Sequence, residues 1–123
     1  MKSVSNNYKG LIVYGIPNCD ITKKTILWLK DHKIDFVFHD YKVAGISKSK
    51  LEDWCKLVGW ERLFNKKSTT WRGLTEAAQA SVTNQVEAIK IMIAQNSVIK
   101  RPVIESGNSI LVGFDEAAFL KCF

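Results

Sequence analysis

Apolar and polar positions along the first third of the chain predict a strand, a helix and a second strand. Residues 11–14 are apolar and rich in strand-forming side chains, which is typical of a buried strand. Apolar positions then recur at helical spacing from Ile21 to Leu29, with lysines on the opposite side. Residues 34–39 alternate again and predict a second strand. This order favours a βαβ unit, in which two parallel strands are joined by a right-handed crossover.

Helical patterns dominate residues 48–96. The first helix of this stretch is expected to follow a cap at Ser47 or Ser49. Its apolar spacing makes Cys55 a core residue rather than a reactive one. The buried positions predicted for this helix are Leu51, Trp54, Cys55 and Val58.

The rest of this stretch is less regular. Residues 63–73 mix basic, hydroxyl and aromatic side chains without a clear period, which is typical of a loop. A short helix is expected from Thr75, and a longer one after a cap at Thr83 or Asn84. The apolar face predicted for the longer helix consists of Val86, Ile89, Met92 and Ile93.

The chain returns to strand character near its C-terminus. Residues 99–105 and 109–112 are expected to pair as a hairpin around a turn at 106–108, and Asp115 to cap a final helix. Pro102 lacks a backbone donor, which is compatible with the start of a strand or with a cis peptide bond in a bend.

Composition narrows the class of protein. With 123 residues and 46% hydrophobic residues, we expect a polar, flexible tail at 1–9 and one α/β domain at 10–123. No signal-like or membrane-spanning apolar run is present. Three widely spaced cysteines indicate neither a disulfide framework nor a metal site. A reducing cytoplasm is therefore the expected location, with no bound metal or resident cofactor.

The positive charge of the chain permits an anionic partner. The formal net charge is +6 and the pI is near 9.3. Nucleic acid is disfavoured, because no RNA- or DNA-binding motif surrounds the basic and aromatic residues of 63–73. His32 and His39 have no second ligand at a suitable spacing, so each is expected at the surface or at a helix end.

Cys19 is the strongest candidate for chemistry. It lies at or just before the start of the first helix, where unpaired N–H groups and the helix dipole favour a thiolate. Lys23 and Lys24 add positive charge one turn later. We expect a lowered pKa for this thiol, although a small buried cysteine without reactivity is the alternative.

Five short motifs occur in one order along the chain and resemble a known family. The layout resembles a thioredoxin-like fold with a helical insertion at about 48–96 and a mixed four-stranded sheet. More narrowly, it resembles the arsenate reductase-like ArsC/Spx family, and within it the YffB branch. The motifs lie at residues 14–20, 39–41, 63–65 with 69–72, 99–102 and 111–114.

The resemblance implies roles for individual residues. Cys19 is implied as the nucleophile, Pro102 as a cis-proline facing it, and Arg101 as a holder of anionic substrate. Where the arsenate reductases have two further arginines, this chain has Asn65 and Gly113, and Thr22 stands where Spx regulators have a second cysteine. The residues expected to bind the anionic partner are Asn18, Lys23, Asn65, Arg72, Arg101 and Pro102.

These features predict a glutathione-dependent thiol-disulfide reductase. A single thiolate requires an outside thiol to resolve its mixed disulfide, so glutathione is the expected co-substrate, with glutaredoxin as a further partner. The substrate is expected to be a small-molecule or protein disulfide. Two alternatives stay open: a non-enzymatic Spx-like regulator that contacts RNA polymerase, and a weak arsenate reductase that uses glutathione and glutaredoxin.

Overall fold

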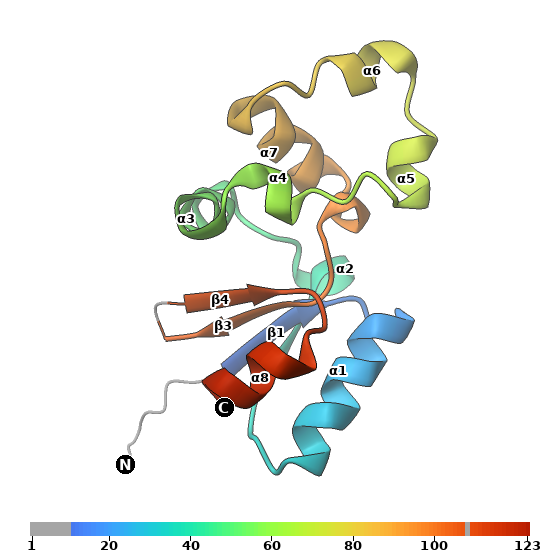
Figure 1. Cartoon of the computed structure of the whole chain (residues 1–123). Coiled ribbons are helices and arrows are strands. Elements are labelled where there is room, and N and C mark those ends of the chain that lie inside the picture. The colour runs from blue at the N-terminus through green and yellow to red at the C-terminus, as the bar shows by residue number, and fades with distance from the viewer. Residues whose placement is uncertain (1–10, 108) are drawn as a thin grey trace. The chain divides into compact units, whose positions relative to one another are not determined.

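The computed structural model describes residues 11–107 and 109–123, which form two compact units (Figure 1). The first unit extends to Tyr41 and resumes at Arg101–Phe123, and the second is Lys42–Lys100. The expected tail at residues 1–9 lies outside the described residues. Among the described residues, no helix has the length and apolar character needed to cross a bilayer.

The first unit contains a four-stranded mixed sheet in the order β2-β1-β3-β4, as expected from the sequence. The inner strand β1 pairs in parallel with β2 on one side and antiparallel with β3 on the other. Strands β3 and β4 form the predicted antiparallel hairpin. The strands are β1 (Leu11–Gly15), β2 (Val37–Asp40), β3 (Val103–Ser106) and β4 (Ser109–Val112).

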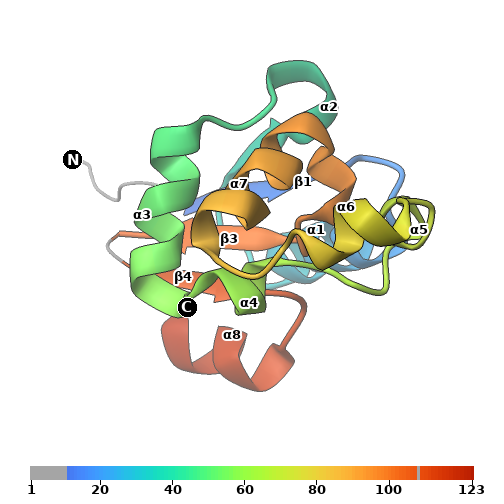
Figure 2. The same ribbon diagram turned by 90° about the horizontal axis from the view of Figure 1, so that it is seen from above.

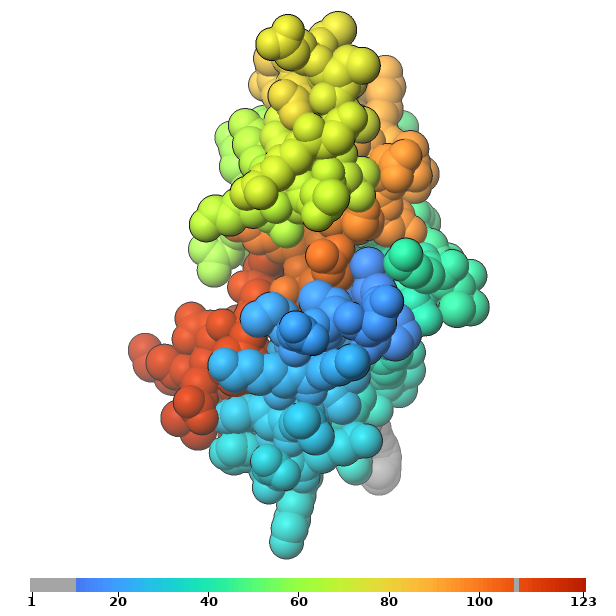
Figure 3. Space-filling view, turned by 90° about the vertical axis from the view of Figure 1, so that its right-hand side faces the viewer, coloured from blue at the N-terminus to red at the C-terminus, as the bar shows by residue number. Residues whose placement is uncertain are grey.

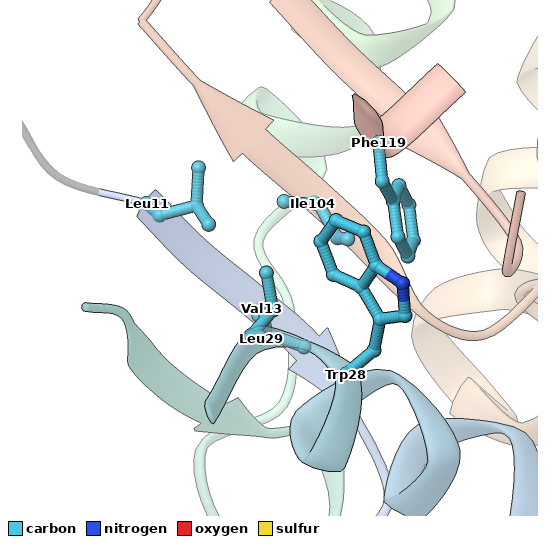
Figure 4. Packing of buried hydrophobic residues seen from close by; sticks show 6 residues of the cluster. All are labelled: Leu11, Val13, Trp28, Leu29, Ile104 and Phe119. Atoms are coloured by element: carbon cyan, nitrogen blue, oxygen red, sulfur yellow. The ribbon is translucent and has the colours of Figure 1, made fainter. Parts of the chain in front are cut away.

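Helices α1 (Asp20–Asp31) and α8 (Glu116–Cys122) cover one face of this sheet (Figure 1). Alternate residues of β1 and β3 point to that face, because side chains of a strand alternate between its two sides. Figure 4 shows the indole of Trp28 beside the ring of Phe119, whose centroids are 5.1 Å apart in an edge-on arrangement. The buried cluster consists of Leu11, Val13, Trp28, Leu29, Ile104 and Phe119.

Two strands begin later than the sequence indicated. After α1 the N–H of Ile34 donates to the carbonyl of Leu29 (2.9 Å), and Lys33 adopts a positive φ of 59°. These local bonds close the helix, so pairing with β1 starts only at Val37. Likewise β3 starts at Val103 rather than at 99, because Ile99 forms an isolated bridge with Phe64.

The second unit is helical, and α3 packs against α4 and α7 (Figure 2). Cys55 is 6% exposed and belongs to the core, as expected. The helices that follow β2 are α2 (Tyr41–Ala44), α3 (Lys48–Val58), α4 (Trp60–Leu63), α5 (Thr69–Arg72), α6 (Glu76–Ala80), α7 (Gln85–Ala94) and the 3-10 helix η1 (Asn96–Val98).

Most expected caps are confirmed. The hydroxyl of Ser47 accepts from the N–H of Lys50 at 3.1 Å, and Thr75 and Asn84 begin α6 and α7 in the same way. The residues predicted as a continuous loop include the short helix α5, since the hydroxyl of Ser68 accepts from a backbone N–H in its first turn.

The apolar face predicted for α7 is only partly correct. Ile89 and Met92 are buried, as expected, whereas Val86 is 63% and Ile93 42% exposed. Ala88 occupies the interior instead. The helix is apolar on several sides, so spacing alone does not define which stripe is buried.

Candidate active site

Cys19 is positioned by the turn that joins β1 to α1. Its N–H donates to the carbonyl of Ile16 (3.1 Å), and its own carbonyl accepts from the N–H of Lys23 (2.9 Å). Cys19 is the N-cap residue of the 12-residue helix α1. Its side chain is half-buried, while the turn around it reaches the surface of the first unit (Figure 3). The predicted location at the helix N-terminus is confirmed.

The surroundings of Cys19 favour a thiolate. Burial alone raises the pKa of this thiol, but the backbone N–H of Thr22, the Thr22 hydroxyl and the Arg101 guanidinium together lower it below its ordinary value. The sulfur makes no capping hydrogen bond of regular geometry. The stabilisation is therefore mainly that of dipoles and a positive charge close to an anion.

Arg101 and Pro102 precede β3 in the same unit as Cys19. The peptide bond between them is cis, as the resemblance implied. Pro102 is buried, and its carbonyl accepts from the N–H of Gly113 at 2.8 Å. Arg101 acts on Cys19 both as a side-chain hydrogen-bond donor and as a charge. Of the expected anion-binding residues, Arg101 is the one that electrostatics connects directly to the sulfur.

Gly113 explains one departure from the arginine-rich pattern of the arsenate reductases. Its φ is +85°, a left-handed conformation that glycine adopts far more easily than residues with a Cβ. No atom lies within 4 Å of a Cβ built there, so space is not the obstacle. An arginine at this position would carry backbone strain as long as the turn keeps this shape.

Tyr14 and Glu105 form a polar pair that the sequence did not indicate as functional. The Tyr14 hydroxyl donates to Oε1 of Glu105 at 2.7 Å. Burial raises the pKa of Tyr14, and the Glu105 carboxylate raises it further. Tyr41 is 1% exposed, and burial also raises its pKa well above the ordinary value, while Arg101 opposes the change. Both tyrosines are thus neutral phenols at physiological pH.

Asn18 and Lys23 are exposed beside Cys19 in the sequence. Lys23 is not among the groups that shift the pKa of Cys19, so its proposed contribution to the thiolate stays a prediction. The Lys24 ammonium lies 4.6 Å from the centroid of the Phe114 ring, which gives that charge a partner in a cation–π contact. The anion-binding role of Asn18 also stays a prediction.

Asn65 and Arg72 belong to the second unit. The Asn65 N–H donates to the carbonyl of Val98 (2.6 Å), and its side-chain oxygen accepts from the N–H of Lys67 (3.0 Å). Arg72 is exposed at the end of α5. A cavity of about 390 Å³ is lined by Trp60, Glu61, Phe64, Asn65, Lys66, Lys67 and Lys100. With three ammonium groups and one carboxylate, this cavity is suited to anions.

The other cysteines and the histidines have different environments. Burial raises the pKa of Cys55, and the carboxylates of Glu52 and Glu61 raise it further, whereas Cys122 is exposed in α8. His32 follows α1, where its Nδ1 lies 2.9 Å from the carbonyl of Trp28. The His39 ring lies 4.7 Å from that of Tyr14. Cys55 therefore lacks the thiolate-favouring surroundings of Cys19.

Thr22 is the residue near Cys19 whose role the sequence reasoning missed. In the sequence, Thr22 stands out only because Spx regulators have a second cysteine at this position. The available signal was its place as the third helical residue after the N-cap, where a backbone N–H points back toward the cap side chain. Glu105 carried no comparable signal, because its partner Tyr14 is 91 residues away in the chain.

Comparison with known proteins agrees with these features. A solved structure named YffB is 44% identical and has a TM-score of 0.87, over 91% of this chain and 97% of that one. The solution structure of an arsenate reductase (ArsC) related protein from Brucella melitensis is 40% identical and has a TM-score of 0.74, over 95% and 97%. The global transcriptional regulator Spx of Lactiplantibacillus plantarum is 25% identical over 86% of this chain and 80% of its own length.

The two solved structures confirm the expected thioredoxin-like fold with its mixed sheet and added helices. The profile of the ArsC family matches residues 14–122, a range that contains Cys19, the cis Arg101–Pro102 bond and Gly113. The chain therefore belongs to the arsenate reductase-like ArsC family.

Proposed function

We propose that this protein is a glutathione-dependent thiol-disulfide reductase in which Cys19 is the nucleophile. The observation that carries the proposal is the position of Cys19 at a helix N-terminus, with a pKa lowered by Thr22 and Arg101. Because the thiolate is the attacking species in thiol-disulfide exchange, a lowered pKa makes this sulfur reactive near neutral pH.

The reaction proceeds in two exchanges. The Cys19 thiolate attacks the glutathione sulfur of a mixed disulfide between the substrate and glutathione. The disulfide bond breaks, the substrate leaves as a thiolate that takes up a proton, and Cys19 is linked to glutathione. A second glutathione thiolate then attacks the glutathione sulfur of this adduct and releases the Cys19 thiolate and glutathione disulfide. The net reaction converts the mixed disulfide and one glutathione into the free substrate thiol and glutathione disulfide, so the substrate sulfur is reduced by two electrons and glutathione is oxidised.

An outside thiol is needed because the chain has Thr22 at the position of a local resolving cysteine. Glutathione supplies this thiol in the proposal, and glutaredoxin is a further candidate reductant. Carboxylates give glutathione a negative charge, which matches the net charge of +6 on the chain. No resident cofactor is required, since both exchanges take place at sulfur.

Basic groups in both units support recognition of an anionic partner. Arg101 is assigned to hold a carboxylate next to the thiolate, because its guanidinium presents a planar pair of donors. Asn18 and Lys23 are assigned as further contacts at the turn, and Pro102 as the backbone that faces the bound disulfide. In the second unit, Asn65 and Arg72 are assigned to the binding of an anion, and the three lysines around Asn65 support this assignment.

Membership of the family supports a second candidate function, that of a regulator. The 25% identity to Spx favours a surface that contacts RNA polymerase without catalysis. A pull-down with RNA polymerase discriminates between the functions. Capture by the intact protein and equally by Cys19→Ser supports the regulator, and the absence of every polymerase subunit counts against it.

Weak arsenate reduction is the third candidate. Two arginines of the arsenate reductases are replaced here by Asn65 and Gly113. Each missing charge-assisted bond is worth about 1.5–3 kcal/mol, so a doubly charged oxyanion is expected to bind poorly. An assay with arsenate, glutathione and glutaredoxin decides this point. Arsenite formation no higher than that of Cys19→Ser removes this function.

The reductase proposal is tested by turnover of a glutathione mixed disulfide in the presence of glutathione and glutathione reductase. The intact protein is expected to consume NADPH through the coupled enzyme, whereas Cys19→Ser is expected to lose that activity while remaining folded. Cys122→Ser is the matched control, because it removes an exposed thiol far along the chain and is expected to retain activity. Equal turnover by the intact protein and Cys19→Ser would refute the proposal.

A further inference from the structure

Thr22 has an unusual environment for a hydroxyl in the first turn of a helix. Its side chain is fully buried, and among the described residues no partner meets hydrogen-bond geometry with its Oγ1. Thr25, one turn later and equally buried, donates its hydroxyl to the carbonyl of Ile21 at 2.9 Å. The carbonyl four residues earlier is the usual hydrogen-bond acceptor for the hydroxyl of a threonine within a helix.

Thr22 lacks this acceptor because it lies in the first turn of α1. The residue four positions earlier is Asn18, which lies in the turn before α1 and is not helical. A buried hydroxyl without a hydrogen-bond partner lowers the stability of the fold, so such groups are rare in native proteins. One explanation for such a group is a hydrogen bond that it makes in another state of the molecule. The sulfur of Cys19, three residues earlier at the N-cap, is the group that gains acceptor capacity when it loses its proton.

We propose that the Thr22 hydroxyl is a positioning group that donates a hydrogen bond to the Cys19 thiolate, and that Gly15 holds it in place. The proposal rests on Cys19 being the reactive thiol of the function proposed above. In the thiol form the hydroxyl lacks a good acceptor. Loss of the proton provides one, so the two groups form their best bond only in the state that attacks a disulfide.

Gly15 leaves the space that Thr22 needs. A Cβ built on Gly15 would lie 2.7 Å from Oγ1 of Thr22 and 2.9 Å from its Cγ2, distances at which atoms must move apart. Gly15 is the last residue of β1, so the end of this inner strand packs directly against the Thr22 side chain. A methyl group at this position would therefore displace the Thr22 hydroxyl.

The electrostatics of Cys19 agrees with this geometry. Both the N–H and the hydroxyl of Thr22 lower the pKa of Cys19, in the same direction as Arg101. Arg101 is the charged group that acts on the sulfur from outside α1. On α1 itself, the charged residues Asp20, Lys23 and Lys24 are exposed. These groups stay unchanged in the variants below, so a change in titration reports the Thr22 hydroxyl.

The test compares two substitutions that separate the hydroxyl from the shape of the side chain. Thr22→Val keeps the branched shape without a donor, and Thr22→Ser keeps the donor without the methyl group. The Cys19 pKa is measured from the pH dependence of its alkylation by iodoacetamide, with peptide mass spectrometry to separate Cys19 from Cys55 and Cys122. Circular dichroism and urea unfolding confirm that each variant is folded.

We expect Thr22→Val to lower the alkylation rate at pH 6 about tenfold, which corresponds to a pKa increase of about one unit for one charge-assisted hydrogen bond. Thr22→Ser is expected to stay within about threefold of the intact protein by the same reasoning. Gly15→Ala is expected to behave like Thr22→Val. In a Thr22→Ala background, Gly15→Ala is expected to have no added effect on the pKa, because the displaced hydroxyl is already absent.

The outcomes distinguish this inference from the proposed function. A Cys19 pKa near 8.5 in the intact protein would overturn both, because no reactive thiolate would exist. A lowered pKa that is the same in Thr22→Val would overturn the role of the hydroxyl alone and leave the reductase proposal standing. An equal loss in Thr22→Val and Thr22→Ser would assign the effect to packing and would also overturn the inference.

Discussion

Arg101 offers a quantitative test of the electrostatics around Cys19. Its guanidinium lowers the pKa of Cys19, both as a hydrogen-bond donor to the thiolate and as a positive charge. Hydrogen bonds to charged groups contribute about 1.5–3 kcal/mol. Cys19 and Arg101 are both partly exposed, so water screens the interaction and about half of that range, about 0.8–1.5 kcal/mol, is expected. At 1.36 kcal/mol per unit, this corresponds to about one pKa unit.

Arg101→Gln removes the charge and retains a polar side chain of similar reach. We expect the Cys19 pKa to rise and, at a pH below the Cys19 pKa of both proteins, the alkylation rate to fall about tenfold, because the rate there follows the small thiolate fraction. Arg101→Lys keeps the charge without the planar pair of donors, so a smaller rise is expected. The assay is alkylation against pH, followed at the peptide that contains Cys19.

Salt provides an independent check on the same residue. Added salt weakens the attraction between exposed or half-exposed charges. The Cys19 pKa of the intact protein should therefore rise with ionic strength, and that of Arg101→Gln should rise less. An unchanged pKa in Arg101→Gln, or an equal response of both proteins to salt, would refute the assignment of Arg101 as a thiolate partner.

The remaining predictions concern stability. The pKa of Cys19 is lower in the folded state than in the unfolded state, so ionisation of this thiol stabilises the fold. The stabilisation is fully present above the unfolded thiol pKa of about 8.5 and is lost as the pH falls through the folded-state pKa. The difference in unfolding free energy between the intact protein and Cys19→Ala should therefore grow from pH 5.5 to pH 9, and a constant difference would contradict the shift. Ser47→Ala should cost about 1 kcal/mol by urea unfolding, because α3 loses its cap, with Ser49→Ala in the same helix near neutral; equal effects would reject the cap. Phe119→Ala should cost about 3–5 kcal/mol, whereas Leu120→Ala, 61% exposed in the same helix, should stay within about 0.5 kcal/mol; a loss of under about 1 kcal/mol at Phe119 would place the core elsewhere.

The fold was largely predictable because its elements carry local signals. The apolar strand at 11–14, the helix that begins after Cys19 and the cap at Ser47 all follow from residues within one or two turns of one another. Errors arose where the pattern of apolar residues does not reveal the contact that decides. The start of β2 depends on a local bond from Ile34 back to Leu29 of α1, and the buried side of α7 depends on the helices packed around it.

The site was predictable to a smaller extent. Helix position and sequence motifs were sufficient to select Cys19 and Arg101, which the structure connects electrostatically. The Glu105 partner of Tyr14 depends on the register of β1 and β3, which spacing along the chain does not reveal. The role of the Thr22 hydroxyl could not be predicted from the sequence either, since only the packing against Gly15 in the folded structure shows that this hydroxyl is buried and held in place.

The most direct test of the reductase account is the fate of Cys19 during turnover. The intact protein is incubated with a glutathione mixed disulfide, quenched with acid and analysed by intact-mass and peptide mass spectrometry. The account predicts a glutathione adduct on Cys19 that disappears when glutathione is added, with Cys55 and Cys122 unmodified at early times. Turnover without an adduct on Cys19, or an adduct that glutathione does not remove, would contradict it.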